Sequence, residues 1–109
     1  MPNYLKNDVT LVRYPFSDLS HSKVRPAIVI NIKHPSKDIL IVPLTSKTNS
    51  LLPGEFKLVD WEEAGLNVPS AVKRGLYTVE KKLVIKIIGK LQISDAKKLD
   101  NSLRSWLGL

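Results

Sequence analysis

The stretch Asp38-Ile39-Leu40-Ile41-Val42-Pro43-Leu44-Thr45-Ser46 is nearly continuous in apolar residues and ends in two small hydroxyl side chains. A strand exposed on one face alternates apolar and polar residues, whereas a strand buried on both faces carries an unbroken apolar run. We therefore expect residues 38–46 to form a strand that is buried on both faces.

Apolar runs before and after this stretch predict further strands, at residues 8–14, 24–33, 55–59, 70–73 and 83–91. Gly89 interrupts the last run, which indicates a bulge or a close approach of two backbones. Residues 15–23 are rich in turn formers and are expected to form an exposed loop, and residues 60–65 a single helical turn.

The end of the chain has a different period. Apolar residues recur at three- and four-residue steps between Ala96 and Leu107, which predicts a helix that Ser94 caps and Gly108 ends. Short strands followed by one amphipathic helix predict a mainly β fold with short helices, a small barrel or sheet with a packed helix.

Composition limits the possible classes of protein. The 109 residues, 43% of them hydrophobic, fit one domain over residues 1–109 and exclude general disorder. The chain has no cysteine, and we find neither an apolar run of membrane-spanning length nor a signal peptide, so we expect a soluble, cytoplasmic protein. A net charge of +7 favours a polyanion as partner, nucleic acid above all, although a merely soluble basic protein has the same balance.

Most enzyme motifs are missing from the sequence. His21 and His34 lie in predicted loops and do not make a metal site, and we expect no metal and no cofactor. We find no glycine-rich phosphate loop and no serine elbow. What remains is Arg25-Pro26 and Thr45-Ser46, two polar pairs at the rims of apolar strands. Their ordinary interpretation is an arginine paired with a carboxylate and hydroxyl groups that stabilise a turn.

A series of short motifs gives these residues a context. The chain resembles the MazF/PemK-like toxin family, whose members open with Gly-Asp-Val and carry a Pro-Phe loop and an Arg-Pro-Ala strand. The matching segments run in order through nearly the whole chain: Asn7-Asp8-Val9, Pro15-Phe16-Ser17-Asp18-Leu19, Arg25-Pro26-Ala27-Ile28-Val29-Ile30, Val42-Pro43-Leu44-Thr45-Ser46, Ala64-Gly65-Leu66, Pro69-Ser70-Ala71-Val72, Tyr77-Thr78-Val79-Glu80-Lys81, Ile88-Gly89-Lys90-Leu91 and Leu107-Gly108-Leu109.

This resemblance implies an SH3-like barrel of the MazF/CcdB type with a C-terminal helix, in a homodimer. It implies the toxin of a type II toxin–antitoxin system, a metal-independent endoribonuclease (an mRNA interferase) that cuts single-stranded RNA at preferred sequences. The partner would be an antitoxin whose acidic, disordered segment blocks the RNA groove. The family's catalytic arginine matches Arg25 and its catalytic threonine matches Thr45, with Ser46 beside it.

The match fails at three positions. The family's first glycine is Asn7 here, and many members have an arginine where this chain has Lys73, followed by Arg74. Some members place an acid close by that helps to activate the nucleophile, but this chain has Gly75. The nearest acid is Glu80, whose role stays open, and so does the identity of the general base.

The residues also suggest how such a reaction proceeds. Without a metal, the 2′-hydroxyl of the RNA attacks the adjacent phosphorus and leaves a 2′,3′-cyclic phosphate and a 5′-hydroxyl. Arg25 would hold the phosphoryl oxygens and Thr45 would orient them. His21 is a candidate base because histidine titrates near neutrality. The alternative interpretation, an exposed loop residue with no role, stays open. Basic residues that could bind the strand are Lys23, Lys47, Lys73 and Arg74.

A second function remains open on the same barrel. The protein could bind nucleic acid without cutting it, or poison gyrase as CcdB-like proteins do. Intact Arg25 and Thr45 favour the nuclease, and the altered residues 73–75 favour the binder.

Overall fold

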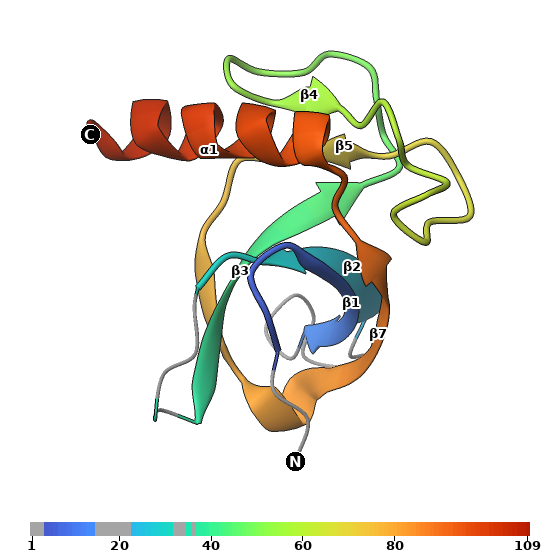
Figure 1. Cartoon of the computed structure of the whole chain (residues 1–109), viewed down its shortest axis with the longest axis vertical. Coiled ribbons are helices and arrows are strands. Elements are labelled where there is room, and N and C mark those ends of the chain that lie inside the picture. The colour runs from blue at the N-terminus through green and yellow to red at the C-terminus, as the bar shows by residue number, and fades with distance from the viewer. Residues whose placement is uncertain (1–3, 15–22, 32–34, 36) are drawn as a thin grey trace.

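The computed structural model describes residues 4–14, 23–31, 35 and 37–109, and the side chain of Tyr14 is outside the description. All of the described strands precede one long helix, which lies across one end of the strands (Figure 1). The elements in chain order are β1 (Asp8–Tyr14), β2 (Lys23–Val29), β3 (Asp38–Thr45), β4 (Phe56–Lys57), β5 (Ala71–Val72), β6 (Tyr77–Glu80), the 3-10 helix η1 (Lys81–Leu83), β7 (Val84–Lys90) and α1 (Ile93–Leu107).

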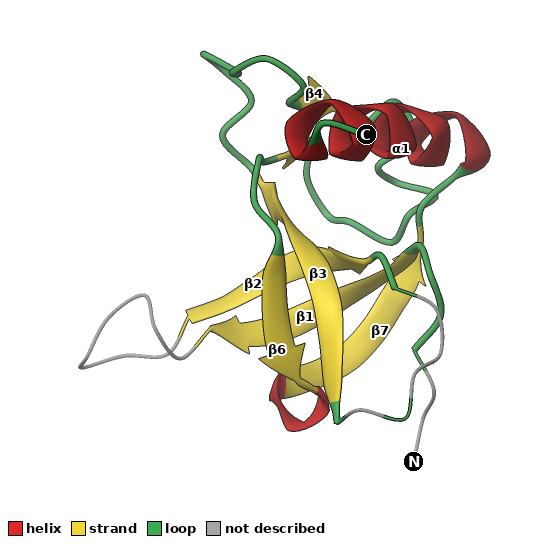
Figure 2. Ribbon diagram, turned by 90° about the vertical axis from the view of Figure 1, so that its left-hand side faces the viewer, coloured by secondary structure: helices red, strands yellow, loops and turns green. Residues whose placement is uncertain are grey.

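The strands form one antiparallel sheet in the order β4-β5-β3-β2-β1-β7, and β6 also pairs with β3. The sheet curls strongly, so that β3 and β6 cross in front of β1 and β2 (Figure 2). η1 joins β6 to β7, but no pairing between these two strands closes the sheet within the described residues. The predicted mainly β, barrel-like fold with a C-terminal helix is confirmed.

β3 is the strand on which this sheet depends. It pairs with β2 along one edge, and on the other edge with β6 along residues 38–41 and with β5 at Leu44 and Thr45. Residues 41–44 are all buried, as the unbroken apolar run predicts. Because successive side chains point to opposite faces, Ile41 joins one apolar cluster and Val42 and Leu44 join the other.

The two clusters have different positions. The first lies between the sheet and α1, which contributes the fully buried Leu99 and the partly buried Leu103 and Trp106. The second contains no residue of α1 and joins β1, β2 and β3 to Val79 of β6 and Val84 of β7. Burial of the first cluster therefore holds α1 against the sheet, and burial of the second stabilises the curled form of the sheet.

Three predicted local features are confirmed, and the predicted start of the helix is wrong. The register between β1 and β7 shifts beside Gly89, where a Cβ would collide with the carbonyl oxygen of Ala64. Gly108 ends α1 with a φ of 73°, and its N–H bonds to the carbonyls of Arg104 and Ser105. The helix begins earlier than predicted, with Gln92 at its N-cap and Ser94 inside its first turn. The single turn predicted at residues 60–65 is present: the N–H of Ala64 bonds to the carbonyl of Asp60 at 3.1 Å, and Gly65 has a φ of 92°.

The start of β1 explains the first departure from the family pattern. Asn7 has a φ of 75°, in the left-handed region that glycine adopts without strain and that asparagine tolerates better than most residues. In this conformation its N–H donates to Val29 and its carbonyl accepts from Leu91. Asn7 thus performs the conformational task of a glycine at this position.

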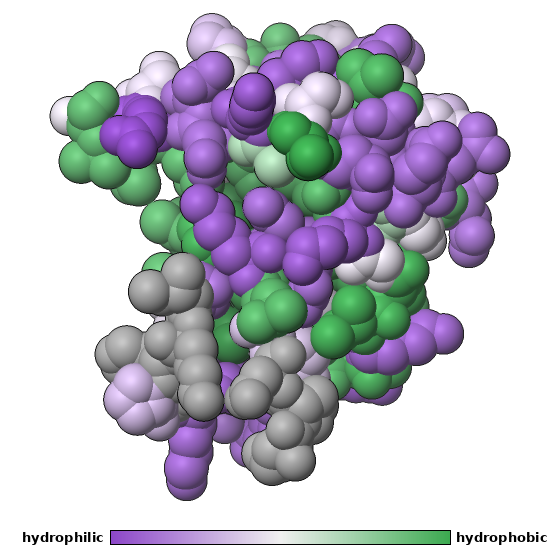
Figure 3. Space-filling model, viewed as in Figure 1, coloured by the Kyte–Doolittle hydropathy of each residue, from purple (hydrophilic) through white to green (hydrophobic). Residues whose placement is uncertain are grey.

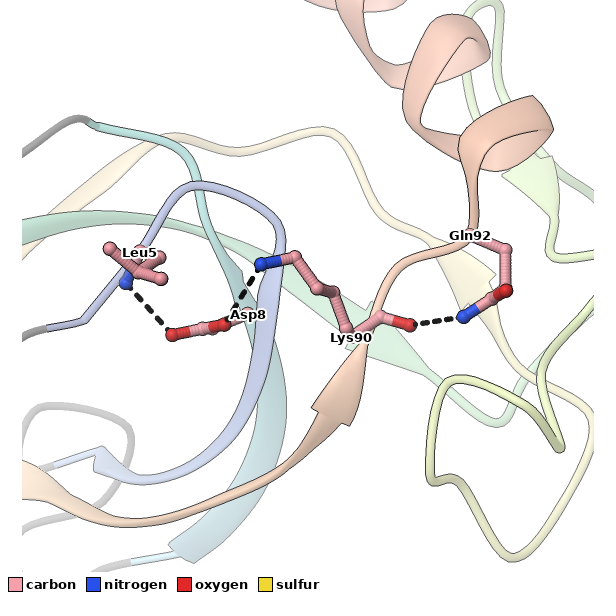
Figure 4. Close-up of polar contacts among 4 residues, drawn as sticks. All are labelled: Leu5, Asp8, Lys90 and Gln92. Atoms are coloured by element: carbon pink, nitrogen blue, oxygen red, sulfur yellow. Dashed lines mark hydrogen bonds and ion pairs between the residues drawn. The ribbon is translucent and has the colours of Figure 1, made fainter.

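Asp8 and Lys90 then connect the first strand to the last (Figure 4). The buried Asp8 carboxylate accepts the N–H of Leu5 at 2.8 Å and lies 3.8 Å from the ammonium group of Lys90. Gln92, the N-cap of α1, donates its side-chain amide to the carbonyl of Lys90 at 3.1 Å. These contacts fix the point where β7 turns into α1.

The helix also holds the long connection between β3 and β4. Ser102 donates its hydroxyl to the carbonyl of Gly54 at 2.7 Å, and the indole of Trp106 donates to that of Pro53 at 3.1 Å. Gly54 has a φ of 87°, and a side chain there would collide with the Trp106 ring. The segment that follows Thr45 and Ser46 is therefore anchored at its far end by α1.

Hydrophilic side chains cover much of the surface over α1, and apolar side chains gather at the C-terminal end of the helix (Figure 3). Leu107 is 53% exposed there and Leu109 82%. No helix in the described part of the chain is long and apolar enough to cross a membrane.

Asp95 is the fully buried carboxylate of the fold. It lies in the first turn of α1 and accepts the N–H groups of Val59 and Asp60 at 3.1 and 3.0 Å. A buried carboxylate needs such donors, because removal from water without hydrogen bonds is costly. Asp95 therefore secures the start of the helix to the chain that follows β4.

We predict that Asp95→Asn lowers the free energy of unfolding by about 1–3 kcal/mol, because an amide group can accept only one of the two N–H bonds and leaves the other donor unsatisfied. Urea unfolding measures the loss. Asp100→Asn is the matched control on the same helix: its ion pair with Lys6, 3.4 Å long, is exposed and should contribute less than about 1 kcal/mol. Equal losses in the two variants would contradict the role of Asp95.

Candidate active site

A hollow of about 920 Å³, open to solvent, lies where β1, β2, β3 and β7 meet the segments around residues 65–70 and 73–77. Five cationic side chains line it, and the described lining contains no carboxylate. Such a one-sided charge distribution attracts and concentrates an anionic ligand. The cations are Lys23, Arg25, Lys47, Lys73 and Lys86.

Arg25 and Thr45 meet at the rim of this hollow. The last β2–β3 pair is Ala27 with Pro43, and this antiparallel register, continued by two residues, places Arg25 across from Thr45. Both side chains line the hollow. Residues that are 20 positions apart in sequence thus line one hollow because β2 and β3 are neighbours.

The Arg25 guanidinium is exposed, and no described carboxylate lies within ion-pair distance of it. The ordinary reading of Arg25, an arginine paired with an acid, therefore finds no support in the described residues. Its planar fork of N–H donors can hold two oxygens of one phosphate.

The Thr45 hydroxyl does make the turn contact that its ordinary reading requires. Its oxygen accepts the N–H of Lys47 at 3.1 Å, which fixes the first residues after β3. The hydroxyl hydrogen has no acceptor among the described residues, so it is available to donate to a ligand in the hollow. Ser46 is exposed and lines the same rim.

The predicted RNA-binding residues separate into two groups. Lys23, Lys47 and Lys73 line the hollow, and the N–H of Lys73 bonds to the carbonyl of Pro43 at 3.0 Å, which ties residue 73 to β3. Arg74 is exposed but does not belong to the lining. β5 and the segment after it therefore bring Lys73, and not Arg74, to the site.

Two further predicted residues do not join this set. His21, the candidate base, lies outside the described residues, as does His34. Glu80 lies at the other end of β6 from Tyr77, pairs in register with Asp38 and forms an exposed ion pair with Lys82 at 3.4 Å. Within the described part of the chain, no group of three or more His, Cys, Asp or Glu residues could hold a metal ion.

Among the lining residues that sequence reasoning missed are Lys86 and Tyr77. Lys86 stands between Ile85 and Ile87 in β7, and its Cα pairs with that of Leu11, which in turn pairs with Pro26 beside Arg25. A lysine inside an apolar strand was a usable signal. Tyr77 carried no such signal, because β6 itself was not predicted.

Glu55 connects the loop before β4 to the segment that carries Lys73. Its carboxylate accepts the N–H of Arg74 at 2.8 Å and the N–H of Leu52 at 2.7 Å. These two bonds, the one from Arg74 first, hold the pKa of Glu55 below its ordinary value, and the charges of Lys73 and Arg74 lower it further. Glu55 thus helps to fix the backbone beside Lys73.

Comparison with known proteins identifies the family of this chain. A barrel-like β fold with a C-terminal helix is the architecture that the sequence resemblance implies. The chain belongs to the PemK-like, MazF-like toxins of type II toxin–antitoxin systems, because the family model matches residues 6–107. The resemblance stated from the sequence is confirmed. A search of curated protein sequences finds no match.

Solved structures of low sequence identity share the fold. MazF from Deinococcus radiodurans superposes with a TM-score of 0.80 at 16% identity, over 100% of both chains. A mycobacterial endoribonuclease in complex with its cognate antitoxin gives 0.78 at 16% identity, over 100% of this chain and 97% of that one. The Mycobacterium tuberculosis toxin MazF-mt6 gives 0.75 at 21% identity, over 94% of this chain and 97% of that one.

We predict that the contribution of Glu55 to stability depends on pH. Because its folded pKa lies below the ordinary value of 4.5, the stabilisation is present above that value and is lost as the pH falls through the folded pKa. Urea unfolding from pH 7 to pH 3 should therefore show wild type more stable than Glu55→Gln at neutral pH, with the difference shrinking in acid. A difference that stays constant over this range would contradict the role of the charged carboxylate.

Proposed function

We propose that this toxin acts, as a single domain, as an endoribonuclease that cleaves single-stranded RNA in the cytoplasm without a metal ion. The observation that carries the proposal is that Arg25 and Thr45, on the neighbouring strands β2 and β3, both line a hollow with five cationic side chains. Membership of the toxin family supports it, and so do the endoribonuclease names of structures that share the fold.

The chemistry follows from the residues at the rim. The RNA's own 2′-hydroxyl attacks the adjacent phosphorus, the bond to the 5′-oxygen breaks, and a 2′,3′-cyclic phosphate and a 5′-hydroxyl result. Arg25 stabilises the negative charge that grows on the phosphoryl oxygens, and the Thr45 hydroxyl donates to one of them. His21, from the chain that precedes Arg25, is the proposed acceptor of the 2′ proton.

The other cations bind the strand. Lys23, Lys47 and Lys73 neutralise phosphates on both sides of the scissile bond, and Lys86 adds a contact from β7. The same charge suits the acidic, disordered segment of an antitoxin, which would occupy the hollow and exclude RNA. A mycobacterial protein that shares the fold has been solved with its cognate antitoxin.

The active form is a homodimer. Within the described residues, no strand covers the outer edge of β7, and its Ile85 and Ile87 are 46% and 42% exposed. A two-fold axis would let two such edges cover each other and would extend the shallow hollow of one chain into a longer groove.

We predict cleavage of single-stranded RNA in excess chelator, with 2′,3′-cyclic phosphate and 5′-hydroxyl ends that mass spectrometry of the fragments identifies. The reason is that the nucleophile belongs to the substrate. Cutting that stops with chelator and returns with magnesium would contradict the mechanism. Binding without cutting would instead favour the non-catalytic alternative.

Arg25→Ala and Lys47→Ala are the matched pair for this assay. Loss of Arg25 should lower the rate by a factor of about 10² or more at any salt concentration, because it removes charge stabilisation in the transition state. Loss of Lys47 should weaken binding modestly and mainly at low salt. Thr45→Val should lower the rate with little change in stability. Equal, salt-sensitive effects of the two charge variants would place the active site elsewhere.

We predict a dimeric mass by light scattering at micromolar concentration across ordinary salt. Ile87→Asp, which places a charge on the exposed edge of β7, should shift the mass toward the monomer because a buried unpaired charge is costly. Ile93→Asp is the control at an apolar residue that is 78% exposed at the start of α1. A monomeric wild type would contradict the prediction.

A further inference from the structure

Tyr77 is the aromatic side chain of the hollow. It is the first residue of β6, pairs in register with Ile41 of β3, and is 41% exposed. Among the described lining residues no other aromatic ring accompanies Arg25, Thr45 and the lysines. The pairing with β3 therefore places one large, flat, partly open ring beside the cations.

Gly75 makes room for this ring. A Cβ at position 75 would lie 2.8 Å from Cε2 of Tyr77 and 3.3 Å from its Cζ and hydroxyl oxygen, closer than real side chains pack. The outer end of the ring thus lies against the backbone of residue 75. Gly75 is the residue that lets the ring occupy this position.

Cations and an aromatic ring recognise different parts of a nucleotide. Lysine and arginine neutralise phosphates, which every nucleotide carries, and so hold the strand without contacting the bases. An aromatic ring offers its face to an unpaired base, and this stacking is typical of proteins that bind single strands. The hollow combines both kinds of group, and apolar side chains such as Val68 and Ile88 also line it.

We propose that Tyr77 is a binding residue that stacks on an unpaired base of the RNA next to the phosphate held by Arg25, and that Gly75 keeps its ring in place. This inference rests on the proposed function and deepens it. It gives the site a contact with the base itself, which the cations lack, and it confines the substrate to strands whose bases are unpaired.

The test is binding of a short single-stranded 2′-O-methyl RNA, which cannot supply the nucleophile, followed by fluorescence anisotropy. Tyr77→Leu keeps an apolar side chain without a ring and should weaken binding roughly 5- to 100-fold, the range for loss of one stacked base. Tyr77→Phe should bind as wild type. On an abasic strand with the same phosphates, the difference between Tyr77→Leu and wild type should vanish.

Two further variants separate stacking from a general effect. Leu76→Ala is the control, because Leu76 is next in sequence and equally exposed at 41% but does not line the hollow; it should bind as wild type. Gly75→Ala should weaken binding by displacing the ring, and should have no further effect in the Tyr77→Leu background.

The possible failures are distinguishable. Unchanged binding in Tyr77→Leu, or an equal loss on the abasic strand, would overturn the stacking role and leave the nuclease proposal intact if wild type still cleaves RNA. If the wild-type protein binds neither the intact nor the abasic strand at low salt, both the stacking role of Tyr77 and the nuclease proposal are overturned.

Discussion

The fold depends on the burial of β3 on both faces. Its apolar run gives Ile41 to the cluster within the curled strands and Val42 and Leu44 to the cluster beneath α1. Its two edges pair with β2, β5 and β6. A polar residue in the middle of β3 would place an unsatisfied group in one cluster or the other. The apolar residues of β3 are therefore needed both for the curled sheet and for the packing of α1.

The same strand places the site. Thr45 is the last residue of β3 and lines the hollow, Arg25 of β2 lines the same hollow, and Lys73 is tied to Pro43 through the backbone. Cations that repel one another are held around one hollow because rigid, buried strands fix their backbones, while their charged ends remain in solvent. The free energy that offsets the repulsion among these cations comes from the packing of the core and not from contacts within the site. The cations can therefore stay without carboxylate partners and bind an anion.

The structure explains two departures from the family pattern, at Asn7 and at Gly75. Asn7 has a left-handed backbone conformation, which glycine adopts without strain. Gly75 lacks the acid of some relatives but accommodates the ring of Tyr77. The nearby carboxylate that the structure does supply, Glu55, accepts two backbone N–H groups, and its lowered pKa suits a structural role better than proton transfer.

The sequence by itself determined the features that depend on local patterns: the buried strand at 38–46, the C-terminal helix with its stop at Gly108, and Arg25 and Thr45 at strand rims. Tertiary structure decided what depends on long-range pairing. β6 is a short edge strand whose pattern is weak without β3 beside it, so Tyr77 was missed. Asp95, a surface residue by type, is buried because distant N–H groups satisfy it, and Lys86 reaches the hollow because β7 pairs with β1.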